Sequence, residues 1–192
     1  DGRELLFHDP SLREKITNEG LNLVITSGEC AGESALFWLA LSEQGRKVLA
    51  ADNGKLINMI CQDALNAVSE TGANVGTTAL YWLAATDDGR DVLLDHPSLR
   101  EKITNEGLNL VIALGERSGT SPLFWLALSE QGRKVLAANN GKLINMISQD
   151  ALNAVIASGD LAGTSALYWL TCGEDGRELL FHDPSLREKI TN

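Results

Sequence analysis

The sequence has little of what several common functions require. It contains three cysteines and three histidines in 192 residues, and 16 Lys and Arg stand against 26 Asp and Glu, a formal net charge of −10. Binding to phosphate backbones depends on Lys and Arg, so nucleic acid is not expected as a partner. No apolar run approaches the roughly 18 residues that cross a membrane, so a membrane partner is not expected either.

The three cysteines, Cys30, Cys61 and Cys172, are odd in number and far apart in the sequence. This spacing predicts free thiols rather than a disulfide or zinc framework. Free thiols indicate a reducing compartment, which is the cytoplasm or, for a protein delivered by an intracellular bacterium, the cytosol of its host. We expect neither a metal nor a cofactor.

Candidate catalytic residues are equally scarce. The sequence His8-Asp9 becomes Asp95-His96 one repeat later, so histidine and aspartate exchange places where a catalytic or metal site needs fixed geometry. We therefore expect His8, His96 and His182 to be polar turn residues that cap a helix. The glycines form no phosphate-binding motif after a strand. The chain is not expected to be an enzyme.

An internal repeat dominates what is present. The dipeptide Gly-Arg recurs with alternating spacings of 43 and 44 residues, at Gly2, Gly45, Gly89, Gly132 and Gly176. A shift of 87 residues superposes two nearly identical blocks, and the last 18 residues, Asp175–Asn192, repeat Asp1–Asn18 letter for letter. Repeats of this length that cannot bury their own apolar surface are typical of solenoids.

Each repeat is predicted to consist of helices. Ser34 is a candidate N-cap for an apolar helix over 35–43, Gly45 is expected to break the chain, and 46–51 reads as a second helix. Asn53-Gly54 is a stop signal with glycine suited to a left-handed conformation. The apolar period from Ile57 to Val68 predicts one continuous helix over 55–71.

The alternate repeat type begins a helix at Pro10, after Asp9, where Ser11 and Glu14 fit a capping box. Its core side is expected to be supplied by Leu12, Ile16, Leu21, Val24 and Ile25, and 18–20 is a candidate break between two short helices. An aromatic pair recurs in every first helix and is expected to pack between repeats, with a ligand-binding ladder as the alternative; it comprises Phe37-Trp38, Tyr81-Trp82, Phe124-Trp125 and Tyr168-Trp169.

No sustained alternation predicts a strand. The fold class is therefore all-α, an α-solenoid of stacked 43/44-residue helical repeats with two to three helices each. One array over 1–192, cut from a longer one, is expected. Its units are a partial unit 1–33, full units of about 34–77, 78–120 and 121–164, and a partial unit 165–192.

One stretch resembles the ankyrin signature: Gly119-Thr120-Ser121-Pro122-Leu123-Phe124-Trp125-Leu126-Ala127. Gly132-Arg133 is similar to the Gly-His of the second ankyrin helix. The repeat is about ten residues longer than an ankyrin unit, closer in length to an armadillo unit. Its connectors, such as Gly28–Gly32, look too short for a β-hairpin. The resemblance implies an ankyrin-related or armadillo-sized scaffold for protein–protein recognition.

The two 87-residue blocks differ mainly in the connectors, and loops on a rigid scaffold often carry recognition. A partner-binding edge is therefore a candidate, with drift on exposed turns as the alternative. Its residues are Glu29, Cys30, Glu33, Ala73, Asn74, Val75, Glu116, Arg117, Ser118, Thr120, Asp160 and Leu161. The expected function is a protein-interaction scaffold whose acidic surface suits a basic partner.

The alternative function is self-assembly. The apolar residues Leu5-Leu6-Phe7 and Leu179-Leu180-Phe181 belong to the two identical end segments and are expected to be partly exposed. Arrays need polar terminal caps for solubility, so such ends favour stacking. Identical segments also compete for one docking site, which is the condition for a domain swap.

Overall fold

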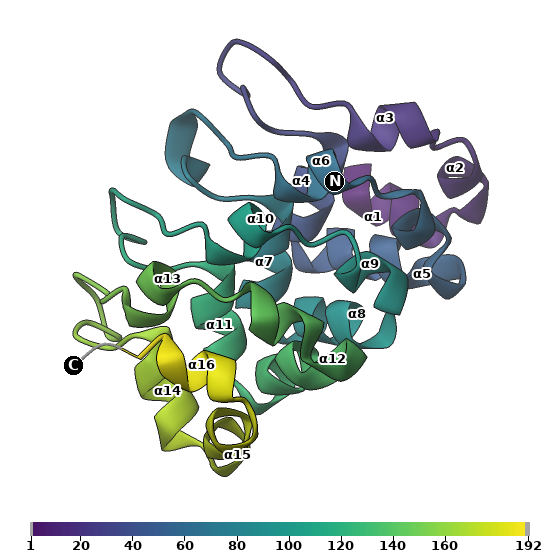
Figure 1. Cartoon of the computed structure of the whole chain (residues 1–192). Coiled ribbons are helices and arrows are strands. Elements are labelled where there is room, and N and C mark those ends of the chain that lie inside the picture. Colours follow the sequence, from purple (N-terminus) through teal and green to yellow (C-terminus); the bar gives the residue numbers. More distant parts are fainter. Residues whose placement is uncertain (1, 191–192) are drawn as a thin grey trace. The chain divides into compact units, whose positions relative to one another are not determined.

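The computed structural model describes residues 2–190, and every regular element in that range is a helix (Figure 1). The chain divides into two compact units, Asp1–Ile103 and Thr104–Asn192. The prediction of an all-α fold is confirmed. Within the described range no helix has both the length and the apolar character needed to cross a membrane.

The first unit contains nine α-helices and one short 3-10 helix: α1 (Gly2–His8), α2 (Pro10–Glu14), α3 (Asn18–Asn22), α4 (Ala35–Leu41), α5 (Glu43–Met59), α6 (Gln62–Asn66), η1 (Gly72–Asn74), α7 (Ala79–Ala85), α8 (Asp87–Asp95) and α9 (Pro97–Arg100). The second unit contains seven α-helices up to residue 190: α10 (Asn105–Asn109), α11 (Pro122–Leu128), α12 (Glu130–Met146), α13 (Gln149–Asn153), α14 (Ala166–Cys172), α15 (Glu174–His182) and α16 (Pro184–Glu188).

The apolar helices α4, α7, α11 and α14 form the centre of each unit. Ser34 accepts a hydrogen bond from the Phe37 amide at 3.1 Å and caps α4 as predicted, although the helix ends at Leu41 rather than at residue 43. Phe37 is buried, but Trp38 is 41% exposed. The prediction that both aromatic residues lie in the core is therefore correct for the phenylalanine and wrong for the tryptophan of this helix.

The Gly-Arg dipeptide lies in the first turn of the helix that follows each apolar helix. Gly45 does not break the chain, because α5 already starts at Glu43; instead a Cβ on Gly45 would lie 2.2 Å from the carbonyl oxygen of Leu39. The absence of a side chain lets α5 pack directly against the backbone of α4. Equivalent approaches in the other apolar helices involve Gly89, Gly132 and Gly176.

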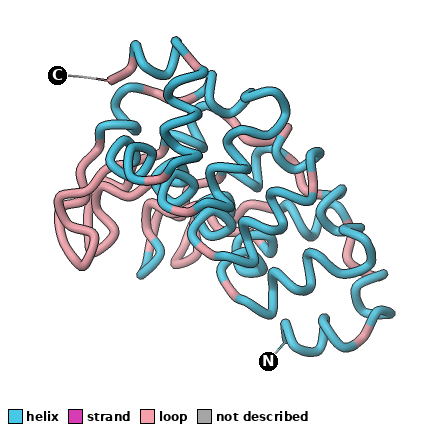
Figure 2. The backbone as a smooth tube through the Cα atoms, turned by 90° about the horizontal axis from the view of Figure 1, so that it is seen from below, coloured by secondary structure: helices cyan, strands magenta, loops and turns pink. Residues whose placement is uncertain are grey.

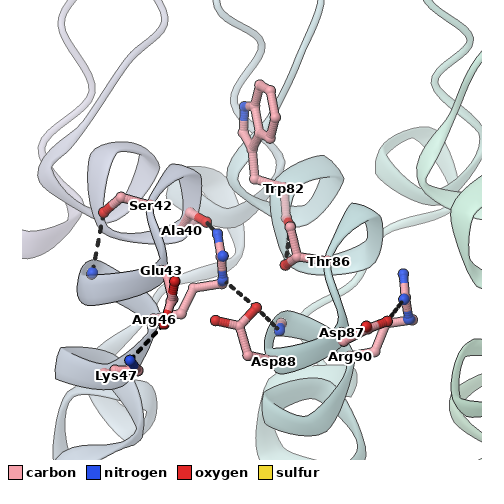
Figure 3. A network of polar contacts seen from close by, with 12 residues as sticks. Ala40, Ser42, Glu43, Arg46, Lys47, Trp82, Thr86, Asp87, Asp88 and Arg90 are labelled. Carbon is pink, nitrogen blue, oxygen red and sulfur yellow. Dashed lines mark hydrogen bonds and ion pairs between the residues drawn. The ribbon is translucent and has the colours of Figure 1, made fainter.

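The side chain of Arg46, the second residue of the dipeptide, contacts both α4 and α8. It donates a hydrogen bond to the Ala40 carbonyl oxygen at 2.8 Å and another to a carboxylate oxygen of Asp88 at 2.8 Å (Figure 3). In the second unit Arg133 makes the same kind of ion pair with Asp175, at 2.7 Å. The buried guanidinium thus links neighbouring elements of one unit.

The predicted continuous helix over 55–71 is wrong. A left-handed run from Asp52 to Gly54 kinks α5, and Gly54, with φ of 71°, takes the left-handed conformation expected of it. A second break follows after Met59, where Cys61 is extended and its Sγ accepts the first capping bond of α6 from Ala64, at 3.4 Å. The apolar period continues through this break, because most of its residues still face the core.

In each unit an asparagine of the preceding repeat holds the second of these breaks in place. The side-chain amide of Asn22 donates to the Met59 carbonyl oxygen and accepts from the Cys61 amide, both at 2.8 Å. Asn109 does the same in the second unit, with Met146 and Ser148, at 2.7 Å. One side chain therefore satisfies two backbone groups that a helix end leaves unpaired.

The region around Pro10 starts as predicted, with proline at the first helical position. The N-cap, however, is Asp9, whose carboxylate accepts from both the amide and the hydroxyl of Ser11, so no capping box forms on Ser11. The break between α2 and α3 lies just before 18–20, and Thr17 caps α3. Of the residues predicted to supply the core, Leu21 is buried and Ile25 is exposed.

Candidate partner-binding edge

The connectors between helices fold back on themselves, which sequence length alone did not indicate. Each forms what we call a finger loop, over residues 25–33 and 69–77 in the first unit and 112–120 and 156–164 in the second. In each finger loop the amide of the first residue donates to the carbonyl oxygen of the last residue. The carbonyl oxygen of the first residue accepts from the amide of the second-to-last residue, and these bonds measure 2.8–2.9 Å. Within residues 2–190 these loops contain no β-strand (Figure 2).

The Gly-x-x-x-Gly pattern provides this geometry. In the first loop Gly28 and Gly32 both have positive φ, of 91° and 83°. Gly32 also lies so close to the neighbouring loop that a Cβ there would overlap the Val68 carbonyl oxygen. The glycines therefore allow both the sharp turn and the side-by-side packing of the two loops in this unit.

Hydrogen bonds join the two finger loops of the first unit. The Glu70 amide donates to the Ala31 carbonyl oxygen at 2.9 Å, and the Thr71 hydroxyl donates to the Glu29 carbonyl oxygen at 2.7 Å. In the second unit the corresponding backbone bond, from Ala157 to Ser118, measures 3.4 Å. The first pair of loops is thus held more firmly than the second.

The base of the first loop pair carries a buried carboxylate. Glu33 accepts from the Ser69 hydroxyl at 3.0 Å, and its other oxygen is buried with no hydrogen-bond partner in the described part of the chain. In the second unit Thr120 and Ile156 occupy these positions and are also buried. Glu33 and Thr120, both named as candidate contact residues, therefore face inward, out of reach of a partner.

The other ten candidate residues lie on the finger loops and are at least partly exposed. Exposed are Glu29, Ala73, Val75, Glu116 and Asp160, while Cys30, Asn74, Arg117, Ser118 and Leu161 are half-buried. The structure brings them together within each unit, on neighbouring loops along one side of the helices (Figure 1).

A set of exposed aliphatic side chains lies on and beside the finger loops, and only Val75 among them was predicted from the sequence as a contact residue. They are Leu23, Ile25, Val68 and Val75 in the first unit and Leu114 and Val155 in the second, of which Leu114 is 78% exposed. The sequence does not distinguish them from core residues, because Val68 ends the apolar period that starts at Ile57, and Leu23 and Ile25 stand in one apolar run with Val24. The comparison of the two blocks identified only Val75 among them.

The tryptophans of the apolar helices lie beside the bases of the loops. Trp82 donates from Nε1 to the hydroxyl of Thr77 at 3.1 Å, and Trp169 donates to Thr164 at 3.2 Å. Each of these indoles therefore has an anchored polar edge and a partly exposed apolar face, an arrangement common at protein interfaces.

The histidines do not form a site. His96 occupies the N-cap position of α9 without a side-chain capping bond and instead packs against Gly54. Asp183, which takes the equivalent place before α16, accepts a capping bond from Leu186. The aspartates, rather than the histidines, therefore do the capping. No group of three metal-ligating side chains occurs between residues 2 and 190.

A hollow of about 350 Å³ lies between α12 and α15 of the second unit. Arg133, Asp175 and His182 contribute to its wall, but the first two are engaged with each other. The finger loops are therefore the stronger candidate site. No family model, curated protein or solved structure matches the chain.

Proposed function

We propose that this chain is an α-solenoid scaffold that binds another protein through its finger loops. The observation that carries the proposal is that each unit has exposed aliphatic side chains on and beside loops that are closed by backbone hydrogen bonds. Exposed apolar residues that cluster on one side of a folded protein mark contact surfaces. Loops held rigid before binding lose little conformational freedom when a partner docks.

The charge of the loops limits the kinds of partner that they can bind. Glu29, Glu116 and Asp160 are exposed near the aliphatic residues, and the whole chain carries a net charge of −10. Such a surface suits a partner with an apolar strip bordered by Lys or Arg, and it accelerates the encounter with that partner at low salt. A nucleic acid does not satisfy this description, because its backbone repeats the negative charge.

The test uses two leucines of similar exposure. Leu114→Ser removes an aliphatic residue, 78% exposed, from a finger loop, and Leu5→Ser removes one, 64% exposed, from α1. Proteins captured by the native chain are identified by mass spectrometry and their affinities are measured for both variants. We expect the loop variant to lose binding and the α1 variant to keep it. Equal loss in both variants, or in neither, contradicts the proposal.

A further inference from the structure

An apolar pocket of about 420 Å³ opens on the first unit. Side chains from four segments line it: Leu6 of α1, Ile16 and Thr17 between α2 and α3, Leu21 of α3, and Ala35, Trp38 and Leu39 of α4. Its surface is unusual within this protein because Ala35 is exposed, whereas the same position of the next apolar helix, Ala79, is completely buried.

The internal repeat shows what covers such a surface. The counterparts of the lining residues, one repeat further on, are fully buried around α4, which packs against α5, α6 and α7; they are Leu49, Leu65, Ala79 and Leu83. In the second unit the same positions are buried around α11, which packs against α12, α13 and α14; they are Leu136, Leu152, Ala166 and Leu170. In both units, therefore, an apolar seven-residue helix fills this kind of space.

Helix α14 is an apolar seven-residue helix with an uncovered side. Helix α14 packs against α11 and α15, but its Tyr168 is 48% exposed, whereas Phe37 and Tyr81 at the same position of α4 and α7 are buried. Phe181 in the following helix, α15, is exposed as well. Residues 175–192, which follow α14, have the same sequence as residues 1–18.

We propose that residues 165–190 of one copy of this chain bind the first unit of a second copy. Helix α14 fills the pocket there, and α15 and α16 take the place of α1 and α2. This inference is independent of the proposed partner-binding function, since it involves no finger-loop residue.

The exchange preserves the contacts that it breaks. Arg13 of α2 donates two hydrogen bonds to Asp52, at 2.8 and 2.9 Å, and further ones to the carbonyl oxygens of Leu6 and Phe7. Arg187 of α16 makes the equivalent carbonyl bonds within its own helix pair, so it is already positioned to meet the second copy's Asp52. Because the sequences are identical, each contact of α1 and α2 with α5 is replaced by the same contact.

The net driving force is then the apolar surface that only the second copy covers. Filling the pocket buries Ala35, Trp38 and the exposed side of α14, none of which is covered by α1 and α2. The incoming helices α15 and α16 are also ordered beforehand by their packing on α12 and α14, so their docking requires little further loss of conformational entropy.

The first test compares one substitution at two positions of identical sequence context. Sedimentation equilibrium of the full chain over a concentration series gives the association constant. Arg13→Ala weakens the helices that must leave, so we expect stronger association; Arg187→Ala weakens the helices that must bind, so we expect weaker association. The expected change is roughly threefold to tenfold in each direction. Circular dichroism checks that both variants fold.

The second test addresses the pocket. Ala35→Glu places a charge in the pocket at an exposed position, so it leaves the isolated chain folded and blocks association; Ala162→Glu, at an exposed position outside the pocket, is the matched control. A native chain that stays monomeric throughout the series overturns the proposal. So does a shift of both arginine variants in one direction, or association that Ala35→Glu leaves unchanged.

Discussion

A close approach between helices α4 and α5 predicts the effect of a single added methyl group. Gly45 has ordinary helical backbone angles in the first turn of α5, so exchange for alanine would by helix propensity alone stabilise the protein by up to about 1 kcal/mol. The new Cβ would, however, lie 2.2 Å from the Leu39 carbonyl oxygen and 2.5 Å from the Leu39 Cα. Both are backbone atoms of α4, which cannot rotate away as a side chain does.

The steric term therefore exceeds the propensity term. Overpacking costs about 1–3 kcal/mol, and the upper part of this range applies where backbone must move, so the free energy of unfolding of Gly45→Ala should fall by about 1–2 kcal/mol. Urea denaturation followed by far-ultraviolet circular dichroism measures this change. The sign of this change in the free energy of unfolding is informative, because helix propensity predicts an increase and packing predicts a decrease.

Gly20→Ala is the matched control for this experiment. Gly20 also lies in a helix, but the atom nearest to its added Cβ is the Thr17 hydroxyl oxygen, at 3.2 Å, which belongs to a side chain and can shift. We expect this variant to be as stable as the native chain or slightly more stable. If Gly45→Ala proves at least as stable as Gly20→Ala, close helix contact is not the reason for the glycine in the recurrent Gly-Arg dipeptide.

Three further changes test the contacts that hold each unit together. Asn109→Ala removes three hydrogen bonds to backbone groups, those of Asn105, Met146 and Ser148, and should lower the free energy of unfolding by about 1–3 kcal/mol in urea denaturation. Asn109→Asp keeps the bond accepted from Ser148, so its stability should lie between those of Asn109→Ala and the native chain. Glu33→Thr combined with Ser69→Ile copies the second unit, removes an unpaired buried carboxylate oxygen and should raise the melting temperature; a lower one would contradict this reading. Hydrogen bonds from Arg13 hold the pKa of Asp52 below its ordinary value of 3.8, so this pair stabilises the fold above that pH and loses its effect in stronger acid. Asp52→Asn should therefore be less stable than the native chain at neutral pH, and the gap measured by urea denaturation should close well below 3.8.

Local signals predicted the helix starts well, because each depends on neighbours in the sequence. Ser34 caps α4 and Pro10 opens α2 by bonds within three residues, so no knowledge of the fold is needed. The left-handed conformation of Gly54 follows from the same kind of signal, an Asn-Gly pair after an apolar stretch.

The split of the region 55–71 could not be read from its apolar period. Ile60 and Cys61 are extended, yet the chain re-enters a helix with the same face toward the core, so a period of 3.6 persists across a gap in the helix. The other copy held the missing clue: Ser148 replaces Cys61 there, and serine is a preferred N-cap residue. Neither copy reveals Asn22, whose role depends on a contact 37 residues away.

The half-exposed tryptophans could not be assigned for a different reason. The segment around Trp38 is apolar on every side, so a helical wheel marks no outer face. In α7 the polar edge of the indole determines which way the ring faces. Trp82 donates to a threonine at the base of a finger loop, so its ring lies at the border of the core.

The finger loops combine an invariant frame with variable side chains, and this division bears on how a partner would be recognised. The frame residues are the two glycines of the Gly-x-x-x-Gly pattern, which have positive φ in every finger loop of both units. The exposed positions differ between the units: Cys30 of the first unit corresponds to Arg117 of the second, which adds a positive charge beside Glu116. A partner that contacts both units therefore meets two different surfaces, one uniformly acidic and one mixed. Recognition of a symmetric partner with two equal halves is disfavoured by this difference, because only one half can be matched to each surface.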